Sequence, residues 1–350
     1  MRLPIFGAGL LVLSATLVAT PASAAPSTPL RVHTFPLGTP TESTRTLRLH
    51  REHTPTFSAY DVTWRRGDGE VAVTGRVRQH GRWTAWQQLD VDGESAKPTG
   101  RQGPSLVWTG PSDGIELKVS GPAADARLEL IDPGSQPADA EAAQVTESAG
   151  RPRIYTRADW GADERQMTWH PEYADAVHAI VLHHTATSND YRPEDVPRII
   201  RSIYHYQAVS LGWGDIGYNV MLDRYGRLWE GRAGGVGKPV VGAHAGGFNT
   251  GTAGIGMIGI YTETKVPDQV IHTAAGYVAW KFGMYGIDPR GSTRITGGPN
   301  TKYDHRVTIT VPRVYPHNQT SATECPGRYG MAALQPIRDQ AHQYGHLYGQ

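Results

Sequence analysis

The stretch Ile180-Val181-Leu182-His183-His184-Thr185-Ala186-Thr187 is the most informative one for the fold of the C-terminal half of this chain. Its apolar residues are typical of a buried strand, and the strand ends in two imidazoles. Adjacent side chains of a strand point to opposite faces, so at most one of His183 and His184 can face a single metal ion. Taken alone, the pair is better explained as hydrogen-bonded histidines at a strand end.

The residues around this stretch predict a mixed α/β domain. Val196, Ile199 and Ile203 fall on one face of an expected helix at residues 193–209. The expected strands are at residues 179–185, which contain the two histidines, and at 218–223, 228–231 and 254–261. Two further helices are expected at residues 267–285 and 331–343. This order is met most simply by a mixed central sheet flanked by helices.

The preceding part of the chain has a different pattern, with short alternating strands separated by regular turn signals. Ile115, Leu117 and Val119 share one face of such a strand, whereas Glu116 and Lys118 share the other. Residues 30–133 are therefore expected to form a smaller antiparallel β-sandwich domain. No candidate catalytic cluster lies in it.

Residues 134–152 are rich in Ala, Gln, Glu, Ser and Pro, with almost no large apolar side chain. Such a composition predicts a flexible linker, because it cannot bury enough apolar surface to stay ordered. The α/β domain is then expected at residues 153–346.

The first 24 residues predict a secretory signal peptide. Arg2 precedes an apolar run from Ile5 to Thr20, and Ala22-Ser23-Ala24 is a small-residue cleavage site. A membrane anchor is the alternative, but the run is shorter than the roughly 20 residues that a spanning helix needs. We expect a secreted chain, attached to the cell wall or free, with no integral membrane segment after signal removal.

Composition narrows the classes of partner. The 34 Lys+Arg residues nearly balance the 33 Asp+Glu, so charge does not indicate nucleic acid or an anionic membrane. At 350 residues the chain is long enough for two domains. Because there is one cysteine, no internal disulfide is expected, and both cores must rest on apolar packing and any bound metal.

That cysteine, Cys325, lies eight residues after His317 and is a candidate metal ligand as a thiolate. The alternative is a small buried apolar residue. A second histidine in this part of the chain, His305, lies twenty residues before Cys325, and we prefer His317 as the partner.

Five segments occur in an order that resembles the zinc-dependent N-acetylmuramoyl-L-alanine amidase and peptidoglycan recognition protein superfamily, and the resemblance covers about residues 153–346. The five segments are Ile154–Ala162, Val181–Ala186, Gly217–Val220, Gly226–Arg232 and Gly242–Ala245. Asn249 and the His317–Cys325 loop follow them in the chain. Each motif alone is weak, whereas the five in order are strong.

The resemblance implies a zinc ion (Zn²⁺) held by His183, His317 and Cys325, with the fourth position open to water, as is usual in catalytic zinc sites. It also implies hydrolysis of the amide between the lactyl group of N-acetylmuramic acid and the first L-alanine of a peptidoglycan stem peptide. Tyr218 is then expected to donate its hydroxyl hydrogen to the developing oxyanion, and Thr323 to hydrogen-bond the tetrahedral intermediate.

Asn219 and His244 are the candidates for substrate binding. The alternatives are that Asn219 is a turn residue at the end of a strand and that His244 is an ordinary loop histidine. Trp160, Tyr204 and Trp213 are expected in the core rather than in the site. The chain departs from the family after His317, because Asn318-Gln319 replaces the usual Arg-Asp. The partner that normally orients this loop is then either missing or supplied elsewhere.

Two other functions remain open at this stage. One is a peptidoglycan recognition protein that binds the polymer and cuts nothing, although Cys325 with Tyr218 favours catalysis. The other is a wall-adhering β-sandwich carrying a degenerate second domain. Composition and motifs leave the oligomeric state, the stem-peptide preference and the proton donor to the leaving amine undetermined.

Overall fold

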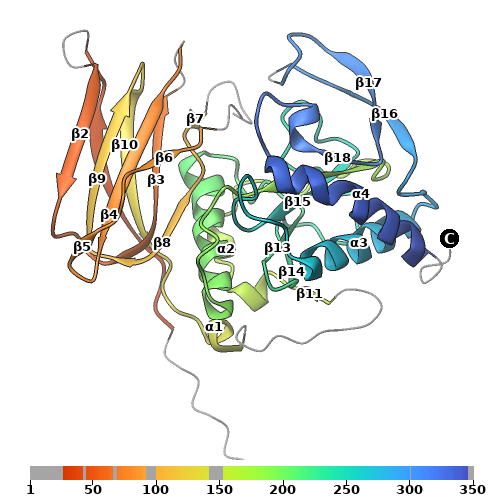
Figure 1. The fold of residues 1–350 in the computed structure, drawn as a ribbon, viewed down its shortest axis with the longest axis horizontal. Helices are drawn as coiled ribbons and strands as arrows, with labels where there is room; N and C mark the ends of the chain where they lie inside the picture. The colour runs from red at the N-terminus through yellow and green to blue at the C-terminus, as the bar shows by residue number, and fades with distance from the viewer. Residues whose placement is uncertain are drawn as a thin grey trace, which may run out of the picture.

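The computed structural model describes residues 27–41, 45–65, 69–91, 100–141, 153–299 and 301–345. These residues form two domains that lie side by side, with the β domain on the left in Figure 1 and the α/β domain on the right. The expected signal peptide lies outside the described residues. Within the described part of the chain, none of the helices has the length and apolarity needed to span a bilayer.

The N-terminal domain is an antiparallel two-sheet β domain, as predicted. One sheet has the order β1-β10-β3-β7 with β8 on β3, and the other has β2-β9-β4-β5 with β6 on β4. The strands are β1 (Arg31–Gly38), β2 (Thr46–Arg51), β3 (Phe57–Arg65), β4 (Ala72–Gln79), β5 (Arg82–Trp83), β6 (Gln87–Leu89), β7 (Arg101–Gln102), β8 (Val107–Ser112), β9 (Gly114–Ser120) and β10 (Ala124–Asp132). The inward side chains of Tyr60, Leu117 and Leu128 belong to one buried core.

The C-terminal domain contains a six-stranded mixed sheet with the order β11-β14-β13-β15-β12-β18. The β13–β14 pair is antiparallel and the other pairs are parallel. Its strands are β11 (Ile154–Tyr155), β12 (Ala179–His184), β13 (Val220–Leu222), β14 (Leu228–Glu230), β15 (Thr252–Met257) and β18 (Val314–Pro316). A separate two-stranded ribbon, β16 (Ser292–Gly297) with β17 (Val307–Pro312), was not predicted.

Strand alternation gives this sheet two different faces. Ile180, Leu182 and Ile255 belong to the core packed with helices α3 (Asp268–Gly283) and α4 (Gly327–Tyr344). Val181 and His183 point to the opposite face, which is covered in part by helix α2 (Val196–His205). His183 therefore lies on the α2 side of the sheet.

The expected helix at residues 193–209 is present in three parts. A 3₁₀ turn, η3 (Pro193–Asp195), leads into α2, which continues as a π-helical turn, η4 (Tyr206–Ser210). Arg192 N–H donates to the Asp195 carboxylate, which satisfies one of the free donors at the start of the helix. Short 3₁₀ turns η1 (Ala158–Trp160), η2 (Glu164–Gln166) and η5 (His317–Gln319) complete the fold.

The two domains share a buried apolar interface. One core cluster joins Leu106 and Trp108 of the β domain to Ile199, Ile203 and Tyr204 of the α/β domain. Burial of apolar surface on this scale favours a fixed arrangement over independent domain motion.

Part of the expected flexible linker is ordered instead. Pro137–Glu141 forms a short helix, α1, and the Asp139 carboxylate accepts two hydrogen bonds of 2.8 Å from Arg201 of α2. Arg201 also donates to the carbonyl oxygens of Pro133 and Trp160. These residues are poor in apolar side chains, as their composition shows, but charge-assisted hydrogen bonds from the buried Arg201 hold them against α2.

Candidate metal centre

Three side chains from distant parts of the sequence meet at the end of β12. His183, His317 and Cys325 are all buried, and their candidate ligand atoms lie within 4.8 Å of one another. The Nδ1 atom of His183 is 3.9 Å from the Sγ atom of Cys325. Zinc bonds of about 2.1 Å to nitrogen and 2.3 Å to sulfur at a tetrahedral angle place such atoms roughly 3.6 Å apart. The donor set and its spacing therefore fit a zinc ion.

The two adjacent histidines have different surroundings, as strand geometry requires. His183 points toward the cluster, whereas His184 accepts a hydrogen bond at Nδ1 from the Tyr261 N–H at 3.3 Å. The backbone N–H of His184 also lies 3.3 Å from the Cys325 sulfur, to which it donates. This donor stabilises negative charge on the sulfur, which is the form that binds a metal.

The buried imidazoles are held in the form that ligates metals. Burial, together with the neighbouring imidazoles of His317, His244 and His184, holds the pKa of His183 well below its usual range. Burial, followed by the effect of His317, lowers the pKa of His184 to about 4. Because a metal binds the neutral ring, proton competition for His183 is weak at neutral pH.

The loop from His317 to Cys325 is closed by its own backbone and braced by the β16–β17 ribbon. The Asn318 N–H donates to the Cys325 carbonyl at 2.9 Å, which ties the two ends of the loop together. The Lys302 ammonium, from the ribbon, donates to the Asn318 carbonyl, and its N–H donates to the Thr320 carbonyl at 3.0 Å. Lys302 thus supplies support for a loop that lacks the Arg-Asp pair usual in the superfamily.

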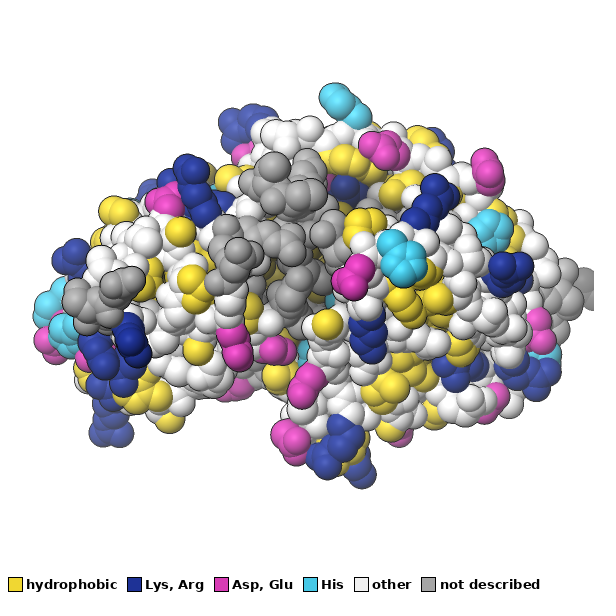
Figure 2. Space-filling model, turned by 90° about the horizontal axis from the view of Figure 1, so that it is seen from above, with side chains coloured by type: hydrophobic (Ala, Val, Ile, Leu, Met, Phe, Trp, Pro, Cys, Tyr) yellow, Lys and Arg dark blue, Asp and Glu magenta, His cyan; other side chains and the backbone are white. Residues whose placement is uncertain are grey.

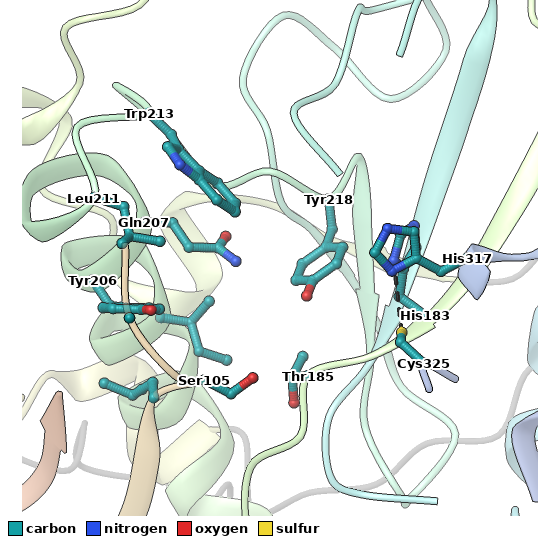
Figure 3. A pocket seen from close by; sticks show the side chains of 13 residues that line it. Ser105, His183, Thr185, Tyr206, Gln207, Leu211, Trp213, Tyr218, His317 and Cys325 are labelled. Atoms are coloured by element: carbon teal, nitrogen blue, oxygen red, sulfur yellow. Dashed lines mark hydrogen bonds between the residues drawn. The ribbon is translucent and has the colours of Figure 1, made fainter. Parts of the chain in front are cut away.

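Tyr218 stands beside the cluster because β15 leaves room for its ring. The ring centroids of Tyr218 and His183 are 5.3 Å apart, and Figure 3 shows the hydroxyl directed into the pocket. A Cβ atom on Gly256 would come within 2.7 Å of the Tyr218 ring. Gly256 is paired with His183 in the sheet, so the absence of a side chain there lets the phenol lie against the metal site.

The cluster opens into a small pocket of about 50 Å³, whose wall includes both domains. Tyr206, Gln207 and Trp213 line it from the segment that contains η4, and Figure 3 shows them facing Tyr218 across the space. Gly103, Ser105 and Leu106 line it from the β domain. The β domain therefore forms part of the wall around the candidate metal centre.

His244 and Asn219 are engaged within the protein. The Nδ1 atom of His244 lies 3.0 Å from the Nε2 atom of His183, and burial lowers the pKa of His244 to about 3. The Asn219 amide donates to the Val240 carbonyl and accepts from the Gly254 N–H. Neither residue lines the pocket, and their hydrogen bonds indicate a role in positioning neighbouring groups, while their role in substrate binding stays a prediction.

The other expectations have mixed outcomes. The Thr323 hydroxyl accepts a hydrogen bond of 3.0 Å from the Cys325 N–H, which places it beside the cluster. His305 is exposed and outside the cluster. Trp160 and Tyr204 are core residues as expected, and Trp213 packs against the same core while it also lines the pocket.

The residues missed by sequence reasoning are those brought in by packing. Gln207 accepts a hydrogen bond from the Gly217 N–H at 2.9 Å and thereby supports the residue before Tyr218. Helical spacing from the apolar face of α2 could have placed Gln207 near the site. No local pattern identifies Ser105, because its position depends on how the two domains pack.

Comparison with known families finds two matches, which cover separate parts of the chain. Residues 173–328 match a family described as N-acetylmuramoyl-L-alanine amidase. Residues 17–150 match a family described as Rv3811 N-terminal galactose-binding domain-like.

The related proteins each match about a third to a half of the chain. Peptidoglycan-recognition protein SC2 of Drosophila melanogaster is 29% identical over 174 residues, which are 50% of this chain and 80% of the relative. Peptidoglycan-recognition protein 2 of Holotrichia diomphalia is 34% identical over 124 residues, 35% of this chain and 61% of the relative. The solved structure of peptidoglycan recognition protein-LE in complex with tracheal cytotoxin is 26% identical, covers 52% of this chain and 92% of its own, and has a TM-score of 0.40.

Proposed function

Because residues 173–328 belong to the N-acetylmuramoyl-L-alanine amidase and peptidoglycan recognition protein superfamily, we propose that this chain is a secreted zinc-dependent amidase of peptidoglycan. The proposed reaction is hydrolysis of the amide between the lactyl group of N-acetylmuramic acid and L-alanine of the stem peptide. The observation that carries the proposal is the gathering of His183, His317 and Cys325 at a pocket that also contains Tyr218.

The donor set supports a catalytic rather than a closed structural zinc site. Three protein ligands leave one tetrahedral position for water or substrate, whereas structural sites use four protein ligands. All three residues line the pocket, so a metal ion that they held would lie at its wall. When bound in such a site, zinc acts as a Lewis acid and lowers the pKa of a bound water to about 7.

The protein residues around the metal have separate roles in this proposal. Tyr218 donates its hydroxyl hydrogen to the oxygen on which negative charge develops, a contribution of about 2.7 to 4 kcal/mol for a single donor in comparable enzymes. His244, in contact with Nε2 of His183, keeps that ring oriented so that Nδ1 faces Cys325. Thr323 accepts a hydrogen bond from the Cys325 N–H, and its hydroxyl is the proposed hydrogen-bonding partner of the substrate during the reaction.

Polymeric or fragmented peptidoglycan is the proposed substrate, and its support comes from the related proteins, which are named for peptidoglycan recognition. The near balance of 34 Lys+Arg and 33 Asp+Glu agrees with a substrate selected by contacts in the groove rather than by long-range charge. Figure 2 shows basic and acidic side chains interspersed over the visible face.

The decisive experiment measures bond cleavage and metal content together. The purified mature chain, incubated with cell-wall sacculi, is expected to release stem peptides with a free L-alanine amine and to contain about one zinc per molecule. Cys325→Ser is expected to lose both the zinc and the activity, whereas the control His305→Ala keeps both.

Binding to sacculi without release of peptides would favour the recognition protein that cuts nothing. A native wild-type chain that contains no zinc and takes up none on addition would contradict the catalytic proposal.

Tyr218→Phe separates chemistry from binding at this site. Loss of the hydroxyl is expected to lower kcat by about 100- to 1,000-fold, because one oxyanion donor is removed. Zinc content and KM are expected to remain near the wild-type values, since the aromatic ring is retained. An unchanged kcat would remove Tyr218 from the proposed mechanism.

A further inference from the structure

A second and larger groove lies between the two domains and meets the metal pocket at Ser105, which lines both. Its volume is about 650 Å³, against about 50 Å³ for the metal pocket. Sites for small-molecule ligands usually fall between about 300 and 1,000 Å³. The larger groove therefore has the size of a binding site and shares Ser105 with the candidate active site.

The two walls of the groove come from different domains. One wall is formed by β4, β6, β8 and the segments beside them. The other wall is the loop from Ala186 to Asp190, which follows the strand that carries His183. A ligand in the groove would thus lie along the β domain while remaining next to the metal site.

The side chains in these walls are mainly neutral hydrogen-bonding groups. The amides and hydroxyls are those of Gln79, Thr84, Gln87, Gln88, Ser105, Thr109, Thr187, Ser188 and Asn189. Among the described residues that line the groove, the charged ones are Asp90 and Asp190, and there is no Lys or Arg. Such a surface suits a neutral ligand rich in hydroxyl and amide groups and disfavours a carboxylate-rich one.

Both walls are held in place by internal hydrogen bonds. Asn189 donates to the Ile260 carbonyl at 2.7 Å and accepts from the Ile260 N–H at 3.0 Å, which fixes the Ala186–Asp190 loop. The Tyr206 hydroxyl donates to the Pro104 carbonyl at 2.6 Å, which ties the segment beside Ser105 to the α/β domain. The groove is therefore largely formed before any ligand arrives, which lowers the cost of ordering it on binding.

From these observations we propose that the groove is a saccharide subsite that binds the glycan strand of peptidoglycan next to the muramic acid whose amide is cut. The proposal rests on the proposed amidase function and extends it to the β domain. N-acetylhexosamine units carry hydroxyl and acetamide groups and no charge, in agreement with the lining. The stem peptide carries several carboxylates, which Asp90 and Asp190 repel.

Gln87 and Gln88 are suitable residues for the test. Both are exposed side chains on β6, whose pairing with β4 uses backbone groups that a truncation to alanine leaves in place. The experiment titrates the full-length wild-type protein with a tetrasaccharide of N-acetylglucosamine, whose units carry no charge, by calorimetry. This probe contains no scissile amide, so binding is measured without turnover.

The Gln87→Ala/Gln88→Ala double variant is expected to raise the Kd for the tetrasaccharide about fivefold, because side-chain alternation along β6 lets one of the two amides face the groove and that hydrogen-bonding group is lost. Its zinc content and Tm should match the wild type. Gln335→Ala, a matched substitution of an exposed glutamine on α4, should leave the Kd unchanged. An equal Kd for the double variant, or competitive displacement of the saccharide by a free stem peptide, would overturn the proposal.

Ser105→Trp tests the junction between the two spaces. The indole is expected to block the passage and lower kcat/KM on sacculi at least tenfold with zinc retained, whereas the control Thr310→Trp on the exposed β17 ribbon leaves it unchanged. An unchanged kcat/KM for Ser105→Trp would also contradict the proposal. Tetrasaccharide binding that depends on Gln87 and Gln88 in a protein without amidase activity would refute the proposed function and retain the subsite.

Discussion

At the scale of single residues, glycines on β15 make space for the functional rings. Gly254 and Gly256 lie two residues apart on the same face of the strand, and a Cβ atom at either would overlap a ring. At Gly254 the ring is that of His244, at 2.4 Å, and at Gly256 it is that of Tyr218, at 2.7 Å. The two glycines have no Cβ atom, and this leaves the space that the His244 and Tyr218 rings fill, because a packed interior has no other free volume for them.

Gly256→Ala is expected to displace the Tyr218 ring while leaving the metal ligands in place. A displacement of about 1 Å of a catalytic group costs on the order of 100-fold in rate, so kcat should fall by about that factor. Zinc content measured by atomic absorption should stay near one per chain. The control Gly237→Ala, where no heavy atom lies within 4 Å of the added Cβ, should keep full activity, and a fully active Gly256→Ala would contradict this role for the glycine.

At the scale of elements, helix α2 joins the parts of the molecule. Its apolar residues pack against both domains, and its Arg201 binds the short helix α1. The side chains of Arg201 and Asp139 are only 5% and 13% exposed, so their ion pair is largely shielded from water. Removal of one partner from such a pair leaves an uncompensated charge and unpaired carbonyl oxygens.

Arg201→Met is expected to lower the free energy of unfolding by about 3 kcal/mol, because the apolar replacement leaves Asp139 and two backbone carbonyls without their donor. Urea denaturation followed by circular dichroism measures this change. Arg165→Met is the matched control: that arginine is 90% exposed and pairs with Asp163, so a change below about 0.5 kcal/mol is expected. Equal effects of the two variants would show that α1 docking adds nothing to stability.

At the scale of the whole molecule, the interface between the domains contains a polar cluster beside its apolar contacts. The Ser210 hydroxyl, from the α/β domain, lies 3.2 Å from Asp61 and 2.8 Å from Glu129 of the β domain. Burial, with the charge of Glu129, raises the pKa of Asp61 well above its usual value. Burial also raises the pKa of Glu129, but hydrogen bonds from His205 and Ser210 outweigh it and hold that pKa below its usual value. The interface thus favours one ionised and one protonated carboxyl group.

This arrangement predicts a pH dependence of stability with a definite sign. The folded state binds a proton at Asp61 more tightly than the unfolded chain does, so its contribution is complete below the ordinary pKa of 3.8 and is lost as the pH rises toward the folded pKa. Asp61→Asn cannot ionise and avoids this loss. The stability of the variant relative to the wild type should therefore increase from about pH 4 upward, as thermal denaturation over a pH series would show.

Asp113→Asn provides a control of opposite sign. A hydrogen bond from Arg78 lowers the pKa of Asp113, so its contribution to stability is present above pH 3.8 and is lost as the pH falls. That variant should lose stability relative to the wild type as the pH rises from acid to neutral. Parallel pH profiles for Asp61→Asn and the wild type would contradict the protonated state of Asp61.

The main strands and helices of the α/β domain and the candidate metal ligands could be predicted from the sequence, whereas the β16–β17 ribbon and helix α1 could not. Alternation of side chains at Ile180–His184 requires that one histidine face away from the other, and the structure separates His183 from His184 in that way. The eight-residue spacing of His317 and Cys325, with the order of the surrounding motifs, indicated the ligand set that the fold brings together. These inferences could be made because they depend on local geometry and on chemistry that few residue types can supply.

The residues around the candidate metal centre could be identified from the tertiary structure alone. Ser105 reaches the metal pocket, Lys302 supports the ligand loop, and His244 contacts His183 rather than lining the pocket, although no periodicity marks any of them. Arg201 orders residues that composition assigns to a flexible linker. Each of these contacts joins residues that are at least 16 positions apart in the chain. Side-chain packing between distant segments depends on the whole core rather than on any local run of residues.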